Sequence, residues 1–299
     1  MKLNKIVFLL LCPLLSFGQI NIVRRSTVTT YPQYPEVGTQ KFIGLFGQSN
    51  ACGIVNVSSA PYSGLIDNAY ILNLCLSTPV FQQLNVGTNN WLYLSSVCAT
   101  TDYGIEVQLM HDLGVLYGQP QYMLKYGYTG TSMANTSGTT PNWNVFAANQ
   151  TIVNDARFEI PGLYGTALNY LNIAQNRIPV LNKKLEWIVW MQGEQDANGG
   201  STLYNNYQTN LTDFINTFRT QSHLGTNLKF LLVQLSSNQT GINATGKTAV
   251  NTAMTNIAGS LTNVFTVSPN GTVQGDGIHY DAAGLATVAT SVYNTIIAN

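Results

Sequence analysis

Five short, almost continuous apolar runs alternate with longer segments of helical periodicity from residue 41 to the C-terminus. The apolar runs cover 41–46, 122–126, 185–191, 228–233 and 264–267, and helical spacing marks 105–116, 163–176, 202–220, 244–259 and 282–297. Strands that alternate with helices form βαβ units, whose parallel strands are buried on both faces. The pattern therefore predicts a three-layer α/β/α sandwich around a central parallel sheet of about five strands.

The first 40 residues do not follow this pattern. Two lysines precede a ten-residue apolar run that ends at Leu15, and small residues stand just before Gln19. This layout is typical of a secretory signal peptide; the alternative, a membrane anchor, needs about 18 apolar residues. We expect cleavage near Gly18/Gln19 and a secreted or periplasmic protein. The sequence thus predicts three segments: a signal peptide over 1–18, an extended arm over 19–40 and one domain over 41–299.

Charge and composition exclude several classes of function. The chain has 13 Lys and Arg against 13 Asp and Glu, and only 9% of its residues are charged. A chain without excess positive charge gains little from a polyphosphate or an anionic membrane surface. We therefore expect no nucleic-acid partner and no integral membrane segment in the mature chain, while the oligomeric state stays open. Hydrophobic residues make up 45% of the chain, enough for a large core.

The cysteines point to at most one disulfide. Cys12 lies in the expected signal peptide, which leaves three cysteines after export and therefore one pair and one thiol. Cys75 and Cys98 flank a part of residues 56–100 where short runs predict β-hairpins, and they are the candidate pair. Cys52 is expected to be a small buried side chain. Because the chain has no Cys-x-x-Cys pair, we expect no structural zinc site.

Reactive and polar residues follow four of the five predicted strands. In open α/β sheets, ligands bind beyond the carboxyl ends of the strands. The sequence therefore predicts that a serine, a glycine-rich turn, a carboxamide with two carboxylates, and an Asp/His pair share one edge of the sheet. These segments are Gly47–Asn50, Gly127–Ser132, Gln192–Asp196 and Asp276–His279.

Among the three histidines, His279 is the best candidate for a catalytic base. Asp276 stands three residues before it, a spacing that brings the carboxylate to Nδ1 and leaves Nε2 for a nucleophile. The alternative interpretation of this spacing is a cap for the final helix. His111 and His223 are interpreted as surface residues.

Together the four segments resemble the SGNH hydrolase superfamily, in its branch of sialate O-acetylesterases and acetylxylan esterases related to carbohydrate esterase family six. The blocks G-Q-S-N, G-G-T-S, W-x-Q-G-E-x-D and D-x-x-H of that branch stand here as Gly47–Asn50, Thr129–Ser132, Trp190–Asp196 and Asp276–His279. The resemblance covers about residue 41 to the C-terminus. It implies a flavodoxin-like fold and a cofactor-free serine esterase that forms an acyl-enzyme and removes O-acetyl groups from sialic acid, xylan or related glycans.

The resemblance also implies roles for single residues. Ser49 would be the nucleophile, His279 the general base and Asp276 the carboxylate that orients it. The oxyanion hole would comprise the N–H of Ser49, the N–H of Gly130 and the carboxamide of Gln192. Thr129 replaces the first glycine of the second block, so the choice between Thr129 and Gly130 as the second donor stays open.

Further polar and aromatic residues are expected to support this site or to bind substrate. Gln48 and Asn50 flank the nucleophile. Glu194 either holds the Gln192 loop by hydrogen bonds or pairs with Asp196 as acid and base, as two carboxylates do in glycosidases. Trp143 either stacks on a sugar ring or anchors its own loop. Lys125 is expected to form a salt bridge at a strand end.

Three other functions remain alternatives. A glycan-binding domain without activity is possible on the same scaffold, but all three predicted catalytic residues are present. A lipase or thioesterase needs an apolar acyl groove, and the polar loop 129–161 argues against one. A metal hydrolase would use His279, Asp276, Glu194 and Asp196, with only one histidine at the edge; we expect no metal.

Overall fold

The computed structural model describes residues 40–299, apart from 90–91, 95–96, 100, 135–140, 147–151, 156–157, 181, 222–223 and 225–226. The predicted signal peptide and the predicted arm up to residue 39 lie outside the described residues, as does His223. Gln40, the last residue of the predicted arm, is the first residue of a central strand.

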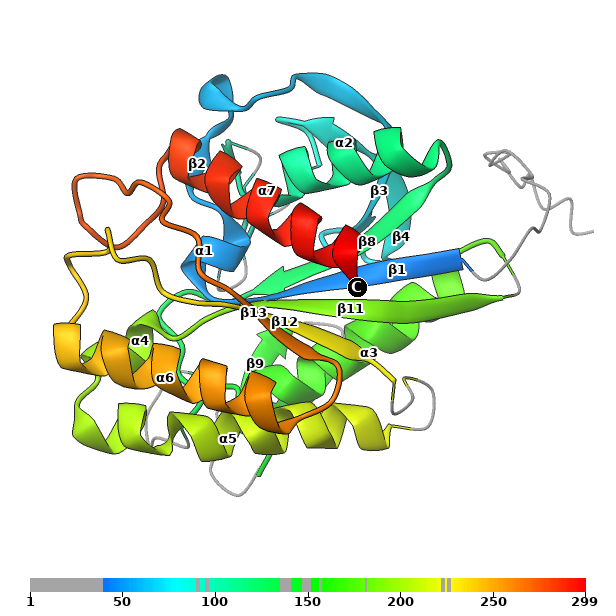
Figure 1. Cartoon of the computed structure of the whole chain (residues 1–299). Coiled ribbons are helices and arrows are strands. Elements are labelled where there is room, and N and C mark those ends of the chain that lie inside the picture. The colour runs from blue at the N-terminus through cyan, green and yellow to red at the C-terminus, as the bar shows by residue number, and fades with distance from the viewer. Residues whose placement is uncertain are drawn as a thin grey trace, which may run out of the picture. The chain divides into compact units, whose positions relative to one another are not determined.

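A seven-stranded sheet forms the centre of the domain (Figure 1). Its spatial order is β13-β12-β11-β1-β8-β3-β4, and every neighbouring pair is parallel except β3 with β4. The five predicted strands are all present and follow the flavodoxin-like order 2-1-3-4-5. Their bounds are β1 Gln40–Gly47, β8 Gln121–Gly127, β11 Lys183–Met191, β12 Lys229–Val233 and β13 Val264–Val267.

The remaining two strands of the sheet come from the region where the sequence predicts hairpins. β3 (Gly64–Asn73) and β4 (Val80–Val86) form an antiparallel hairpin. β3 also pairs in parallel with β8 and so joins the hairpin to the sheet. Both strands mix buried and half-exposed residues, so they lack the continuous apolar run that marks the inner strands. Shorter pairs lie outside the sheet: β2 Val55–Asn56 with β7 Asp102–Tyr103, β5 Leu92–Leu94 with β6 Val97–Ala99, and β9 Ile152–Asp155 with β10 Phe158–Pro161.

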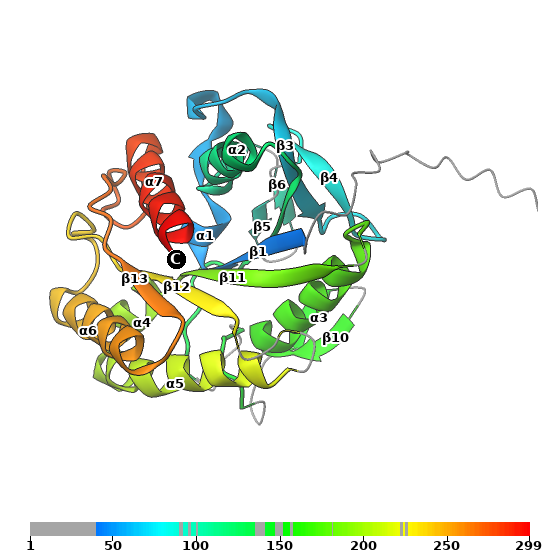
Figure 2. The same cartoon turned by 45° about the vertical axis from the view of Figure 1, so that its right-hand side comes forward.

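Helices cover both faces of the sheet, which confirms the predicted three-layer α/β/α sandwich. α2 (Glu106–Tyr117) and α7 (Ala282–Ala298) lie on one face (Figures 1 and 2). The other face carries α3 (Gly162–Arg177), α5 (Ser201–Thr220) and α6 (Ala244–Ser260). The short elements are α1 Ser49–Cys52, η1 Val57–Ser59 and α4 Glu194–Asn198. None of the described helices has the length and apolarity that crossing a bilayer requires.

The alternation of side chains along β1 divides the core into two clusters. Phe42 and Phe46 pack with α3 and α5, whereas Ile43 and Leu45 pack with α2 and α7. Successive residues of a strand point to opposite faces, so a fully apolar strand fills both layers of the core. All four side chains are at most 7% exposed.

The carboxyl ends of three neighbouring strands lie in register at one edge of the sheet. Gly47 at the end of β1 pairs with Gly127 of β8 on one side and with Met191 of β11 on the other. From β1 the chain first builds the β8 side of the sheet and later returns to build the β11 side. Such a switch point opens a crevice where α/β proteins bind ligands.

Candidate active site

Gly47 allows the sharp turn that brings Ser49 over the end of the sheet. Its φ is +149°, and a Cβ at this position would lie 1.9 Å from the carbonyl oxygen of Met191. The N–H of the next residue, Gln48, donates to that same oxygen at 3.0 Å. Only a glycine fits so closely against the neighbouring strand. The strand therefore passes directly into α1, with Ser49 as its first residue and only 5% exposed.

Ser49, His279 and Asp276 form a continuous hydrogen-bonded row. Nε2 of His279 lies 2.9 Å from Oγ of Ser49, and Nδ1 lies 2.6 Å from Oδ2 of Asp276. The structure thus brings together the three residues that the sequence places in one catalytic unit. Asp276 does not cap the final helix, because the side chain of Asp281 accepts from the N–H of Gly284 and fills that role.

The carboxylate of Asp276 is held in its ionised form. Burial opposes ionisation, but hydrogen bonds from the backbone and side chain of His279 and from the N–H of Ile278 outweigh it and lower the pKa of Asp276 to about 2. The two backbone bonds to Oδ1 measure 3.0 and 2.8 Å. A fixed anion at Nδ1 sets the tautomer of the imidazole and stabilises its protonated form.

Asn50 connects the nucleophile to the turn that carries His279. Its Oδ1 accepts from the N–H of Tyr280 at 3.1 Å, and its Nδ2 donates to Oε1 of Glu194 at 2.6 Å and to the carbonyl of Ile278 at 3.3 Å. Gln239, which the sequence analysis missed, donates to the same carbonyl at 2.7 Å and to Oε1 of Glu194 at 3.4 Å. No motif marks Gln239, because its loop reaches the site only through the fold.

Glu194 is a supporting residue in this arrangement. It is 4% exposed, and burial raises its pKa despite the hydrogen bonds from Asn50 and Gln239. Asp196 is fully buried and accepts from the N–H of Met133 at 3.1 Å, which ties it to the glycine-rich loop. Burial raises the pKa of Asp196 to about 7. Oε1 of Glu194 and both oxygens of Asp196 accept hydrogen bonds from protein groups. These bonds favour the supporting interpretation of Glu194 over an acid and base pair.

Gln192 differs from its expected role as an oxyanion donor. Its Nε2 donates to three protein oxygens: Oδ2 of Asp196 at 2.5 Å, the carbonyl of Thr131 at 2.8 Å and Oε1 of Gln48 at 3.3 Å. A carboxamide nitrogen carries two protons, so these partners already occupy it. Gln192 is 1% exposed and is not among the residues that line the cavity beside Ser49. In this structure it is a positioning residue that fixes the loop of Thr131.

Trp143 does not reach the substrate side of the site, and its interpretation as a sugar-stacking residue is wrong. Its ring is fully buried in an aromatic cluster, with centroids 5.1 Å from Trp190 and 5.7 Å from Tyr126. Its Nε1 donates to Oγ1 of Thr131 at 3.0 Å. The indole therefore anchors the glycine-rich loop to the core.

A cavity of about 390 Å³ opens beside the nucleophile. Gly130 has a φ of +65° at its rim, and the turn is closed by a 2.7 Å bond from Oγ1 of Thr131 to the carbonyl of Tyr128. Four lining residues carry no predicted role: Ile54, Gln195, Asn198 and Ile278. The full lining is Gln48, Ser49, Ile54, Thr129, Gly130, Glu194, Gln195, Asn198, Ile278 and His279.

Two further predictions concern buried groups next to the site. Lys125 forms the expected salt bridge, 2.9 Å from Glu106, with both side chains buried. Cys52 is the expected small buried side chain, and burial raises the pKa of its thiol to about 12. Cys75 is disulfide-bonded, whereas the side chain of Cys98 lies outside the described part, so the Cys75–Cys98 pair stays a prediction.

The sequence of the chain matches a known family over more than half its length. The family model described as carbohydrate esterase, sialic acid-specific acetylesterase, matches residues 130–298. The chain belongs to this family of carbohydrate esterases. It is therefore a carboxylic ester hydrolase. The matched residues include Gly130, Gln192, Asp276 and His279, and the fold adds Ser49 from the unmatched part.

Several solved structures share the fold of this chain, whereas no curated protein sequence matches it. A protein from Arabidopsis thaliana superposes with a TM-score of 0.63 at 14% identity, over 88% of this chain and 99% of that one. NanS gives 0.59 at 11%, over 88% and 98%. A carbohydrate acetylesterase from Xanthomonas citri gives 0.60 at 15%, over 86% of this chain and 55% of its own. At sequence identities of 11–15%, these structural similarities show a shared fold.

Proposed function

We propose that this carbohydrate esterase removes O-acetyl groups from glycans by a two-step mechanism with Ser49 as the nucleophile. The observation that carries the proposal is the row from Ser49 through His279 to Asp276, which opens into a cavity large enough for a sugar. A serine hydroxyl becomes a nucleophile when an adjacent base takes its proton and a third group orients that base.

In the first step, Oγ of Ser49 attacks the acetyl carbonyl carbon while Nε2 of His279 takes the serine proton. The ester C–O bond then breaks, and the imidazolium returns this proton to the departing sugar oxygen. In the second step, His279 takes a proton from water, whose oxygen attacks the acetyl-serine carbonyl. Collapse of that intermediate returns the proton to Oγ and releases acetate. Asp276 stays ionised throughout and stabilises the imidazolium.

Backbone N–H groups are the oxyanion donors in this proposal. The N–H of Ser49 begins α1, where no intrahelical carbonyl is available to it. The second donor comes from the turn at Thr129 and Gly130, which lines the same cavity. Gln192 holds this turn through the carbonyl of Thr131. Each such donor contributes about 3–4 kcal/mol to the stabilisation of the transition state.

The lining supports a short acyl group and a polar leaving group. Most of the lining residues are polar or glycine, and Ile54 and Ile278 are the apolar exceptions. This lining favours an acetylated sugar over a long-chain ester. The expected signal peptide would place the enzyme outside the cytoplasm, where acetylated polysaccharides or sialoglycans are its substrates.

Hydrolysis of 4-nitrophenyl acetate, butyrate and octanoate by wild type and Ser49→Ala tests this proposal. We expect a preference for acetate and a fall in kcat of about 10³-fold or more in the variant, since loss of one triad member removes nucleophilic catalysis. Ser58→Ala, at an exposed serine nearby, is the matched control. Equal rates for wild type and Ser49→Ala would overturn the assignment of the nucleophile, and glycan binding without turnover would become the working hypothesis.

A further inference from the structure

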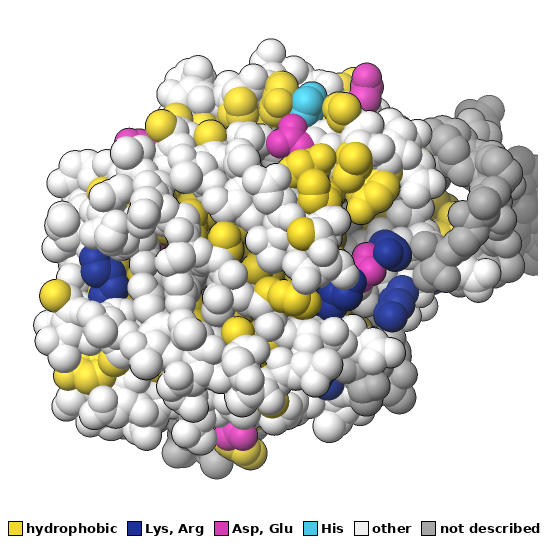
Figure 3. Space-filling view, in the orientation of Figure 1, with side chains coloured by type: hydrophobic (Ala, Val, Ile, Leu, Met, Phe, Trp, Pro, Cys, Tyr) yellow, Lys and Arg dark blue, Asp and Glu magenta, His cyan; other side chains and the backbone are white. Residues whose placement is uncertain are grey.

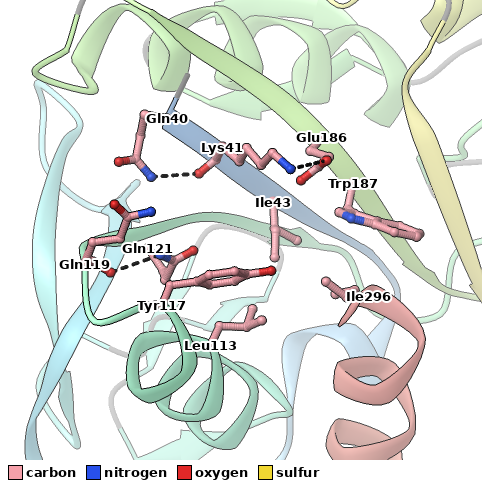
Figure 4. A pocket seen from close by; sticks show the side chains of 10 residues that line it. All are labelled: Gln40, Lys41, Ile43, Leu113, Tyr117, Gln119, Gln121, Glu186, Trp187 and Ile296. Atoms are coloured by element: carbon pink, nitrogen blue, oxygen red, sulfur yellow. Dashed lines mark hydrogen bonds and ion pairs between the residues drawn. The ribbon is translucent and has the colours of Figure 1, made fainter. Parts of the chain in front are cut away.

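A second cavity lies at the opposite edge of the sheet from Ser49. It is formed where β1 and β11 begin, between the end of α2 and the end of α7 (Figure 4). Gln40 lines it, whereas Gly47, at the other end of β1, lies beside the nucleophile. Seven steps of about 3.3 Å along a strand separate the two ends by roughly 23 Å. A ligand in this cavity is therefore remote from the catalytic residues.

The lower wall of this cavity is an aromatic ring on apolar side chains. Tyr117 is 48% exposed, and its ring lies across the cavity from Lys41 in Figure 4. Ile43, Leu113 and Ile296 also line the cavity and are at most 7% exposed. An accessible ring among apolar side chains is the kind of surface on which the C–H face of a sugar packs.

The rest of the wall offers hydrogen-bond acceptors in a fixed arrangement. Nε2 of Gln40 donates to the carbonyls of Lys41 and Pro120 at 3.1 and 2.9 Å, and Nε2 of Gln121 donates to the carbonyl of Gln119 at 3.0 Å. Both protons of Nε2 of Gln40 are thus used, and Gln121 keeps one proton. The carboxamide oxygens of Gln40 and Gln121 are acceptors for a ligand. Hydroxyl groups are the donors that suit them.

The charges on the wall balance each other. Nζ of Lys41 lies 2.8 Å from Oε1 of Glu186, and both residues line the cavity. The lining thus holds one positive and one negative charge, which supply one donor and one acceptor to a ligand. Nζ of Lys229, outside the lining, lies 3.5 Å from the same oxygen of Glu186. The volume of about 160 Å³ is below the roughly 300–1,000 Å³ of sites for drug-sized molecules and suits a single ring.

We propose that this cavity is a second, non-catalytic binding site for one uncharged sugar unit of a glycan. The hydroxyl groups of the sugar would donate to Gln40 and Gln121, and its C–H face would pack on Tyr117. A second weak site on an enzyme raises its avidity for a polymer, because binding at one site increases the effective concentration at the other. The inference does not depend on the proposed catalytic mechanism.

Saturation-transfer NMR with methyl β-D-glucopyranoside tests this site, with the whole chain carrying Ser49→Ala so that no turnover occurs. We expect saturable binding that weakens at least tenfold when Tyr117→Ala is added. Leu116→Ala is the matched control, because it removes a 49% exposed side chain next to Tyr117 that does not line the cavity. This control should bind like the parent, and circular dichroism checks that all variants fold.

The charge of the ligand is tested with methyl β-D-glucuronopyranoside, which differs in carrying a carboxylate. We expect it to bind more weakly than the glucoside. Binding of the glucuronoside alone would overturn the assignment to an uncharged sugar. No saturable glucoside signal, or a signal that Tyr117→Ala leaves unchanged, would overturn the site itself, since binding beside Ser49 is insensitive to a change roughly 20 Å away.

Discussion

Nε2 of His279 lies 2.9 Å from Oγ of Ser49, although 230 positions separate the two residues in the chain. A second bond runs beside it, from the N–H of Tyr280 to Oδ1 of Asn50 at 3.1 Å. The neighbours of the two reacting residues are thus bonded to each other. This pairing fixes the turn of His279 against the first turn of α1, and it makes Asn50 a positioning residue.

We expect Asn50→Ala to lower kcat for 4-nitrophenyl acetate by about 10²-fold, because a displacement of about 1 Å at a catalytic group has this effect. KM should change little, since the small acetyl ester has few contacts to lose. Steady-state kinetics separate the two parameters. Asn56→Ala, at an exposed asparagine whose side chain accepts from the N–H of Ser58, is the control. A rise in KM at constant kcat would contradict the positioning role.

Asp276→Asn should lower kcat/KM about 10³- to 10⁴-fold. An amide can still accept from the two backbone N–H groups, but it presents a donor to His279 and stabilises the wrong tautomer of the imidazole. The measurement is kcat/KM for 4-nitrophenyl acetate at pH 7, and the midpoint of thermal unfolding shows whether the variant folds. Activity close to wild type would remove Asp276 from the catalytic unit.

The lowered pKa of Asp276 predicts how the free energy of unfolding responds to acid. Its pKa is lowered to about 2 from 3.8, so the folded state prefers the anion. The stabilisation is complete above pH 4 and is lost as the pH falls through 4 towards 2. Because the side chain is 45% exposed, solvent screening keeps this contribution small.

Much of the fold can be predicted because the inner strands are apolar on both faces. β1 and β11 place large side chains in both core clusters, and this continuous pattern identifies them in the sequence. β3 and the edge strand β4 both mix buried and exposed residues, so their pattern does not distinguish a separate hairpin from an extension of the sheet. The sequence pattern therefore predicts about five strands, whereas the sheet has seven.

The site was predicted where residues follow a strand or share one turn. Ser49 follows β1 directly, and Asp276 and His279 are three residues apart. Gln239 reaches the site only through the packing of helices and loops, which no local spacing encodes. The structure does not show Gln192 in its predicted role as an oxyanion donor, for a related reason. Its Nε2 donates to Thr131 and Gln48, which follow two other strands of the sheet.

Trp143→Phe separates a structural tryptophan from a sugar-stacking one. The variant keeps an aromatic ring but removes the bond from Nε1 to Thr131 and part of the packing against Trp190. We expect the free energy of unfolding to fall by about 1–3 kcal/mol. Urea unfolding measures this loss, and KM for an acetylated glycan should stay within about twofold. A large rise in KM with unchanged stability would restore the stacking role.

The raised pKa of Asp196 predicts that the free energy of unfolding falls as the pH rises. Burial raises its pKa from 3.8 to about 7, so between these values the folded state binds more protons than the unfolded state. The free energy of unfolding therefore decreases from pH 4 to pH 7 and levels off above it. At about 1.4 kcal/mol per pKa unit, the decrease from this group reaches at most about 4 kcal/mol.

The variant Asp196→Asn removes this titration while keeping an acceptor for the N–H of Met133. Urea unfolding of wild type and variant at pH 4.5, 6 and 7.5 should therefore show the wild type losing more stability across the series. Asp67→Asn, at an exposed carboxylate, controls for the loss of one negative charge. If the free energy of unfolding depended on pH in the same way for wild type and Asp196→Asn, the prediction would be contradicted. Asp196 would then stay ionised in the folded protein, because the hydrogen bonds from Gln192 and Met133 outweigh the effect of burial.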